Sequence, residues 1–303
     1  MSRQQQLREE ITNQIVAAIE AGTLPWRRPW SVSVNAGCPT NASTKRAYRG
    51  VNPLILDLVA ATNGYRSRFW ATFNQWKGLG SSVLRGQHGT RIVFSTPMTK
   101  STRKPTGEEV EETFWVLRSF VVFNAQQCVG ADRFLVTDEK PVPQEEEARF
   151  ARAFEVAWTT GADVRHGGNR AFYSVPGDYI QMPEKSTFKD GLPSYFDTLF
   201  HELAHWTECR TDWKASPLGE NYAAGELRAE LASCYLCNEL GIRTDSTNDN
   251  TAAYLSSWLN RMKEDSTFIF RISSAATRAA DLVMSFSQPV EQPADTTYES
   301  VPC

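Results

Sequence analysis

The sequence is 303 residues long, with 41% hydrophobic and 11% aromatic residues, which is enough to form two domains that each bury a core. It has no apolar run near the ~18 residues of a membrane span, and its polar start lacks the apolar centre of a secretion signal, so we expect a cytoplasmic protein without a membrane partner. The net charge is only −3, and six scattered cysteines without an export signal argue against a disulfide framework.

The charge is distributed unevenly along the chain. Residues 1–130 carry 16 Lys and Arg against 8 Asp and Glu, whereas residues 131–303 carry 16 against 27. Between residues 21 and 107 there are 13 basic residues and a single acid, Asp57. A block of this composition indicates a polyanionic partner for the first half of the chain.

The first half is expected to mix helices and strands. Residues 5–22 place leucine and isoleucine at helical spacing before Gly22, a common helix stop. A second helix is expected at 53–63, a strand pair around a turn between Gly86 and Gly89, and a long strand at 114–123. These elements predict an α+β domain over residues 1–130.

Three clusters in this half interleave cationic and aromatic side chains. Cations neutralise phosphates and exposed rings stack on unpaired bases, at about 1–3 kcal/mol per base, so the clusters predict binding of single-stranded nucleic acid. No helix-turn-helix, zinc finger or basic zipper is present to read a duplex. For the two tryptophans of the first cluster, burial in the core is an equally good interpretation. The residues predicted to bind are Trp26, Arg27, Arg28 and Trp30 in the first cluster, Lys45, Arg46, Tyr48, Arg49 and Asn52 in the second, and Arg66, Arg68, Trp70, Gln75 and Lys77 in the third.

The second half is acidic and is expected to be mainly helical with a small β-sheet. We expect a linker at residues 131–146, a second domain at 147–286 and a disordered tail at 287–303, where the apolar pattern ends. Helices are expected at 145–159, 251–264 and 266–286, and a strand hairpin at 170–182.

One segment of this half carries the pattern His201-Glu202-x-x-His205. On a helix, positions i and i+4 lie one turn apart on the same face, so the two imidazoles can bind one metal ion, with Glu202 beside them as a general base for hydrolysis. The apolar flanks predict a buried helix that holds its ligands rigidly. Because the chain has only four histidines, chance explains the pattern poorly, and we interpret it as a zinc site.

A hydrolytic zinc site needs three protein ligands and one open position. The helix expected over residues 219–233 offers Glu226 and Glu230, which are four residues apart and share a face. One can bind zinc while the other supports an imidazole N–H. Arg228 between them is expected to face solvent, and His166 is the next candidate ligand if neither glutamate binds.

The order of several short motifs resembles one known family. The motifs Pro25-Trp-x2-Pro-Trp30, Tyr48-Arg-Gly-Val-Asn52, Trp70-Ala-Thr-Phe-Asn-Gln75 and Gly86-x2-Gly89 resemble the N-terminal domain of ArdC-type antirestriction proteins, and His201-Glu-Leu-Ala-His-Trp206 resembles their zincin-like domain. The resemblance covers nearly the whole chain. It implies a plasmid- or phage-borne protein that protects incoming DNA from host restriction, with an N-terminal domain that binds single-stranded DNA and a C-terminal metallopeptidase fold.

The resemblance adds three expectations about the second half. Zincins with a glutamate as third ligand often carry a further acid one turn later, which favours Glu226 over Glu230. An edge strand before the metal helix borders the cleft in such folds, so Tyr179 to Met182 would pair with an extended peptide. A host protein related to restriction is the implied peptidase substrate.

Two functions from different classes stay open. In the first, zinc acidifies water and Glu202 carries a proton to the leaving amine of a peptide. In the second, the protein coats single-stranded DNA and its zincin domain is structural. Glu202 favours the first function, because a structural site needs no carboxylate beside the metal. A nuclease is disfavoured, since nuclease sites gather carboxylates around Mg²⁺.

Overall fold

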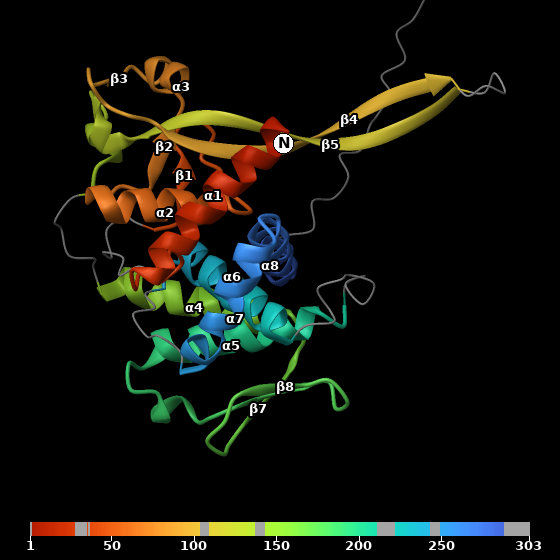
Figure 1. The fold of residues 1–303 in the computed structure, drawn as a ribbon. Coiled ribbons are helices and arrows are strands. Elements are labelled where there is room, and N and C mark those ends of the chain that lie inside the picture. Colours follow the sequence, from red (N-terminus) through yellow and green to blue (C-terminus); the bar gives the residue numbers. More distant parts are fainter. Residues whose placement is uncertain are drawn as a thin grey trace, which may run out of the picture.

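The structure is a computed structural model that describes residues 2–27, 35, 37–103, 109–136, 143–210, 222–242 and 249–287. Part of the predicted linker and nearly all of the predicted tail lie outside these residues. The described elements form an N-terminal half of helices and strands and a mainly helical C-terminal half, which confirms the predicted α+β fold (Figure 1). None of the described helices is long and apolar enough to cross a membrane.

A four-stranded sheet organises the N-terminal half. The elements of this half are α1 (Arg3–Glu20), β1 (Thr40–Asn41), α2 (Asn52–Asn63), β2 (Phe69–Ala71), α3 (Phe73–Gly78), β3 (Ser82–Val83), β4 (Thr90–Arg103), β5 (Glu109–Asn124) and β6 (Cys128–Val129), with short 3-10 helices at Ala125–Gln127 and Asp132–Phe134. The sheet has the order β1-β2-β5-β4, in which only β1 and β2 are parallel. α2 packs against β4 and α1 packs against α2, while β3 and β6 form a separate pair.

β4 and β5 form a long hairpin that reaches beyond the body of the molecule (Figure 1). Their register runs from Thr90 opposite Val122 to Arg103 opposite Glu109. Near the body, β4 and β5 contribute buried side chains to the core. Farther out, exposed Phe94 and Phe120 meet edge to face at 5.5 Å between ring centroids. The strand expected at 114–123 is part of β5.

The turn that leads into β4 requires glycine at two positions. Gly86 has a φ of +85°, which other residues rarely adopt. A Cβ atom on Gly89 would lie 2.3 Å from Cγ1 of Val121 and 2.9 Å from Cζ of Phe123. The positive φ of Gly86 and the close packing of Gly89 on β5 therefore explain the two glycines of the motif.

The C-terminal half is a group of helices with a small sheet on one side (Figure 1). Its elements are α4 (Pro143–Thr159), β7 (Asp163–His166), β8 (Phe172–Ser174), β9 (Tyr179–Met182), a 3-10 turn at Lys185–Thr187, α5 (Leu192–Thr207), α6 (Tyr222–Glu239), α7 (Asp249–Glu264) and α8 (Phe268–Ser285). The sheet has the order β7-β9-β8, with β9 parallel to β7 and antiparallel to β8. β9 is thus the central strand, and the prediction that it pairs with a peptide as an edge strand is wrong.

The two halves share a core. Ile15 of α1 packs in one cluster with residues of α6, α7 and α8. Trp26 belongs to the same cluster, and its ring lies edge to face with Trp258 of α7 at 6.2 Å. At the surface, Nζ of Lys263 on α7 lies 2.6 Å from Oε1 of Glu20 on α1. The first helix of the N-terminal half is therefore buried by helices of the C-terminal half, so tests of either half belong in the full chain.

Candidate functional site

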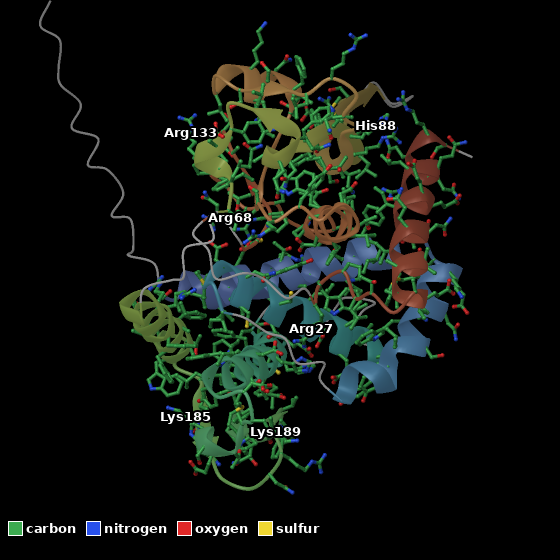
Figure 2. The ribbon with its side chains drawn as sticks, turned by 90° about the vertical axis from the view of Figure 1, so that its left-hand side faces the viewer. Arg27, Arg68, His88, Arg133, Lys185 and Lys189 are labelled. Carbon is green, nitrogen blue, oxygen red and sulfur yellow. The ribbon has the colours of Figure 1, made fainter. Side chains whose placement is uncertain are left out.

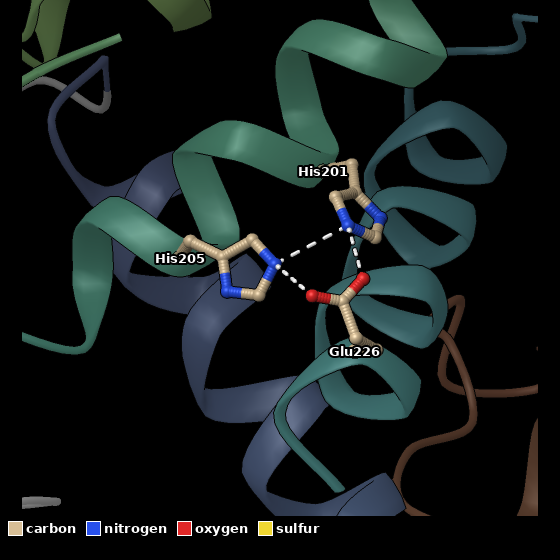
Figure 3. A group of neighbouring side chains, drawn as sticks. All are labelled: His201, His205 and Glu226. Atoms are coloured by element: carbon tan, nitrogen blue, oxygen red, sulfur yellow. Dashed lines mark hydrogen bonds and ion pairs between the residues drawn. The ribbon is translucent and has the colours of Figure 1, made fainter. Parts of the chain in front are cut away.

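Two helices of the C-terminal half place the candidate metal ligands. α5 is fixed by an apolar face that includes Leu199 and Leu203, both fully buried. Pro193 in its first turn costs no helical hydrogen bond there. His201 and His205 lie one turn apart on α5 and point toward Glu226 on α6 (Figure 3).

The three side chains converge on one point. Nε2 of His201 lies 3.2 Å from Nε2 of His205, and each of these atoms lies 3.5 Å from one carboxylate oxygen of Glu226 (Figure 3). The ligand atoms lie within 4.8 Å of one another, and no other group of three or more such residues is found in the described part of the chain. His201 and Glu226 are buried, while His205 is partly open.

Glu230 has a different environment from Glu226. Its Oε1 accepts hydrogen bonds from Nε of Arg27 at 2.7 Å and from Nε1 of Trp26 at 3.2 Å. Of the two glutamates that the sequence left as alternatives, the structure therefore brings Glu226 to the imidazoles. Glu230 is held from behind by the N-terminal half.

Two charged residues next to His205, Glu208 and Arg228, belong to the site but were not predicted from the sequence as part of it. Nδ1 of His205 lies 2.9 Å from Oε1 of Glu208, and Glu208 also forms an ion pair with Arg228. Arg228 is only 3% exposed, so the expectation that it faces solvent is wrong. The available signal was Glu208 itself, an acid three residues after His205 and on the same helix face. Such a partner fixes the orientation of a metal-binding imidazole.

The protonation of the site follows from burial and these contacts. Burial would lower the pKa of His205, but hydrogen bonds to Glu208 and Glu226 outweigh it and raise the pKa to about 10. Burial would raise the pKa of Glu226, yet its contacts with His201 and His205 hold it well below the usual range. Burial raises the pKa of Glu202 against the opposing effect of the histidines. Glu202 is thus the better proton acceptor of the two glutamates.

The donor atoms fit a divalent metal ion. Two imidazole nitrogens that face each other at 3.2 Å need a proton or a cation between their lone pairs. Two imidazoles and one carboxylate are also the protein ligands of a catalytic zinc site that keeps one position open. The residues present at this site therefore suit the ion that the HExxH motif predicts.

A cleft of about 470 Å³ leads to the cluster and is lined by residues of α5, α6, α7 and the segment around β8. Glu202 lies in its wall, where the backbone N–H of Tyr173 on β8 donates a hydrogen bond to the carboxylate. Among the described strands, β8 pairs only with β9, so its second edge is available along the cleft. The rim carries exposed apolar and aromatic side chains, namely Phe172, Val175 and Tyr222.

His166 is placed away from this cluster. Its Nε2 lies 3.0 Å from the hydroxyl oxygen of Tyr195, and the two rings are stacked at 5.9 Å. The fallback role of His166 as third ligand is therefore not supported by its position.

Five of the residues predicted to bind DNA have buried side chains. Trp70 is 1% exposed, and its backbone oxygen accepts a hydrogen bond from the hydroxyl of Tyr48 at 3.2 Å. Asn52 exchanges two hydrogen bonds with the backbone of Val93. These side chains are used for packing or internal ion pairs in this structure, and their contact with DNA stays a prediction: Trp26, Arg27, Tyr48, Asn52 and Trp70.

The remaining predicted residues are distributed as follows. Gln75 is half-buried and completes a capping box at the start of α3, where its Oε1 accepts from the backbone N–H of Thr72 at 3.0 Å. Arg49 forms an exposed ion pair with Asp281 of α8. Arg28 and Trp30 lie outside the described residues. Exposed positions are held by Lys45, Arg46, Arg49, Arg66 and Lys77, and Arg68 is half-buried.

One cationic surface of the N-terminal half contains a residue that sequence reasoning missed. Nζ of Lys45 lies 4.3 Å from the ring centre of Phe134, and the guanidinium of Arg133 lies 4.8 Å from the same ring. Arg133 also donates a hydrogen bond to the backbone oxygen of Leu79 just after α3. Burial lowers the pKa of Lys45, and the charges of Arg133 and Arg68 add to this effect. Arg68 and Arg133 lie on the same side of the molecule (Figure 2).

We call this region the Lys45–Arg133 surface and define it by Lys45, Phe73, Lys77 and Arg133. Phe73 and Lys77 lie four residues apart on α3, which puts them on the same helix face, and Phe73 is 54% exposed. α3 is tied to the turn before Lys45 by a hydrogen bond between the side chains of Asn41 and Gln75. Lys45 and Arg133 lie beside one ring, and the neighbouring helix α3 adds exposed Lys77 and Phe73, which gives three exposed cations and one exposed ring on adjacent elements.

Comparison with protein families gives one match for each half of the chain. Residues 5–123 match the N-terminal domain of anti-restriction factor ArdC. Residues 151–276 match a zincin-like metallopeptidase. The second match contains His201, Glu202, His205 and Glu226.

Similar solved structures and relatives cover the whole chain. The metal-free crystal structure of the antirestriction ArdC protein from plasmid R388 is 36% identical, with a TM-score of 0.74, and the match covers 93% of this chain and 97% of that one. Its Mn(II)-bound structure is 35% identical, with a TM-score of 0.70 and 94% and 99% covered. The uncharacterized protein y4eC of Sinorhizobium fredii is 34% identical over 90% of both chains. The DNA primase TraC of Escherichia coli is 35% identical over 97% of this chain, which spans 28% of TraC.

Proposed function

Since the chain belongs to the ArdC family of antirestriction proteins, we propose that it protects incoming plasmid DNA from host restriction in the cytoplasm by two linked means. Its N-terminal half binds single-stranded DNA, and its C-terminal half is a metal-dependent peptidase. The observation that carries the second part is the cluster of His201, His205 and Glu226, with Glu202 beside it in a cleft. We take zinc as the ion because this ligand set is typical of zinc, and Mn(II) as the alternative because of the related R388 structure.

Each residue of the site has a defined chemical role in this proposal. The two imidazoles and Glu226 would hold the ion, which when bound would supply Lewis acidity toward a peptide carbonyl and toward water. Glu202 takes a proton from water and passes it to the leaving amine, and its raised pKa favours this exchange near neutral pH. Glu208 accepts from Nδ1 of His205 and so directs Nε2 toward the ion.

The proposed substrate is an extended segment of a host protein related to restriction. Among the described strands β8 pairs only with β9, and the backbone N–H of Tyr173 donates to Glu202, so a peptide added along β8 would use the remaining main-chain groups of this edge beside Glu202. Phe172 and Tyr222 at the rim favour apolar or aromatic side chains of the peptide.

Single-stranded DNA binds to the Lys45–Arg133 surface in this proposal. Three cations there neutralise phosphates, and Phe73 offers one ring to an unpaired base. Replacing Lys45, Lys77 and Arg133 together with serine should weaken binding of a labelled oligonucleotide at least tenfold. The slope of log affinity against log salt should become about 2 less negative, since each lost phosphate contact in a single strand contributes about 0.7. Fluorescence anisotropy at several salt concentrations measures both.

The matched control removes three exposed cations from the other half. A triple serine variant of Arg165, Lys189 and Lys263 has the same net charge as the first triple variant. Comparing the two therefore separates the effect of where the cations lie from the effect of overall charge. It should bind the oligonucleotide nearly as wild type does. Equal losses in the two triple variants would mean that the DNA site is not the Lys45–Arg133 surface.

The raised pKa of His205 predicts an unusual pH dependence of metal binding. Because its pKa is about 10, the imidazole carries a proton at neutral pH, and the ion must displace it. Affinity for zinc or Mn(II) should therefore still rise about tenfold per pH unit between pH 7 and 8.5, where a histidine with a pKa near 6.5 would already be neutral. Competition with a chromophoric chelator measures this slope. Glu208→Gln weakens one of the hydrogen bonds that raise the pKa of His205, so it should make the slope of log affinity against pH less steep. A flat slope in the wild-type protein would contradict the prediction.

A further inference from the structure

One residue of the N-terminal half lies between the two helices that carry the metal ligands. Arg27 has 6% of its side chain exposed and lies in the interior of the molecule (Figure 2). Its Nη1 lies 2.5 Å from Oδ2 of Asp197 on α5, and its Nε lies 2.7 Å from Oε1 of Glu230 on α6. One guanidinium thus joins α5 to α6.

The two acids that Arg27 holds stand one helical turn from metal ligands. Asp197 precedes His201 by four residues on α5, and Glu230 follows Glu226 by four residues on α6. Residues four apart share a face of a helix. Arg27 therefore lies about one helical turn from the site and joins the ligand-bearing faces of the two helices.

Further contacts make this arrangement rigid. Nε1 of Trp26 donates to the same carboxylate oxygen of Glu230 at 3.2 Å, and the backbone oxygen of Trp26 accepts from the thiol of Cys234. The hydroxyl of Ser233 on α6 donates to Oδ1 of Asp197 at 2.8 Å. Asp197 is thus fixed by Ser233 of α6 as well as by Arg27, and Glu230 is fixed by two adjacent residues of the N-terminal half.

The charges of this region explain why Glu230 needs a partner. Burial would raise the pKa of Glu230, but Arg27 keeps it lowered, so the carboxylate is ionised. His201 also contributes to this lowering, which places the negative charge of Glu230 within electrostatic reach of the site. A buried carboxylate on the same helix face as Glu226 is also a competing ligand for an ion held by the imidazoles.

We propose that Arg27 is a positioning residue of the metal centre, supplied by the N-terminal half. It keeps Glu230 out of the coordination shell and holds α5 and α6 so that Glu226 alone completes the histidine pair. This inference rests on the proposed metal centre. The metal affinity of the C-terminal half would then depend on Arg27, a residue of the N-terminal half that the sequence predicted to bind DNA.

The test measures metal affinity in the full-length protein. Arg27→Gln should lower the affinity for zinc and for Mn(II) about 10- to 100-fold, the range for outer partners of metal ligands. Lys263→Gln is the control, because it removes a cation from an exposed ion pair that also joins the two halves. It should leave the affinity unchanged. Chelator competition gives the affinities, and circular dichroism reports folding.

A double variant separates positioning from a general loss of structure. If Arg27 acts by holding Glu230, then Arg27→Gln combined with Glu230→Gln should bind the ion within about threefold of wild type, since no displaced carboxylate remains. This variant also removes the uncompensated charge of Glu230, while Asp197 keeps its hydrogen bond from Ser233, so it tests the inference even where Arg27→Gln fails to fold. Wild-type affinity in Arg27→Gln, or no recovery in the double variant, would overturn the inference.

The outcome is distinguishable from failure of the proposed function. If wild-type protein binds neither zinc nor Mn(II), the proposed metal centre is wrong. If wild type binds the ion and His201→Ala does not, while Arg27→Gln binds as well as wild type, only the role of Arg27 is wrong.

Discussion

Replacing Glu226 with alanine should lower the affinity for zinc or Mn(II) by about 100-fold or more, because it removes the carboxylate that meets both imidazoles at 3.5 Å. This loss of affinity should exceed the 10- to 100-fold that is typical when a residue hydrogen-bonded to a metal ligand is replaced, because here the ligand itself is removed. His201→Ala and His205→Ala should behave in the same way. Elemental analysis of purified protein and chelator competition measure the bound ion.

Glu230→Gln is the matched control for this experiment. It changes a glutamate of the same helix face, and its side chain contacts Trp26 and Arg27 in the structure. The glutamine oxygen can still accept from Arg27 and Trp26, so this variant should keep the affinity within about threefold of wild type. A variant without Glu226 that retains full metal content, or a larger loss in Glu230→Gln, would mean that the third ligand has been assigned to the wrong glutamate.

The choice between these glutamates shows where sequence reasoning stops. His201 and His205 could be paired from the sequence because helix geometry is local and fixes their spacing. Glu226 and Glu230 satisfy the same local rule, so helical periodicity cannot rank them. Arg27 separates them, and it lies about 200 residues earlier in the chain, a contact that only the folded structure reveals.

The aromatic clusters of the N-terminal half show a related limit of the sequence. Rings that stack on bases and rings that fill a core have the same composition and spacing in a sequence. In the structure, Trp26 and Trp70 are fully buried, while Phe73 is exposed on α3. Most of the cationic positions are exposed, because lysine and arginine are rarely buried without a partner. Arg27 is the exception, and its two carboxylate partners come from the other half.

The strand beside the active helix was misplaced because sequence patterns do not give strand order. β8 and β9 were both expected as a hairpin, and both are present. The parallel pairing of β7 with β9 makes β9 central and leaves β8 at the edge near Glu202. A long-range pairing of this kind does not change the alternation of apolar and polar residues in either strand, so the sequence does not reveal it.

Replacing Glu202 with glutamine should abolish peptide cleavage while the ion, the fold and DNA binding are kept. Glutamine has nearly the same volume but cannot take a proton from water, so a loss of about 10²- to 10⁴-fold is expected for the chemical step. The Lys45–Arg133 surface lies in the other half and should be unaffected. Transfer of unmodified plasmid DNA by conjugation into a restricting host, compared with a host that lacks restriction, measures the biological effect.

Glu264→Gln provides the control, because it makes the same chemical change at an exposed position of α7. It should protect incoming DNA as wild type does. If Glu202→Gln binds metal and DNA normally but loses protection, proteolysis is the mechanism. If it protects fully, catalysis is not required, and the protein acts by occupying single-stranded DNA. The buried carboxylate, its raised pKa and the cleft beside it favour the first outcome, since a site used only for structure has no need to hold a proton acceptor next to the ion.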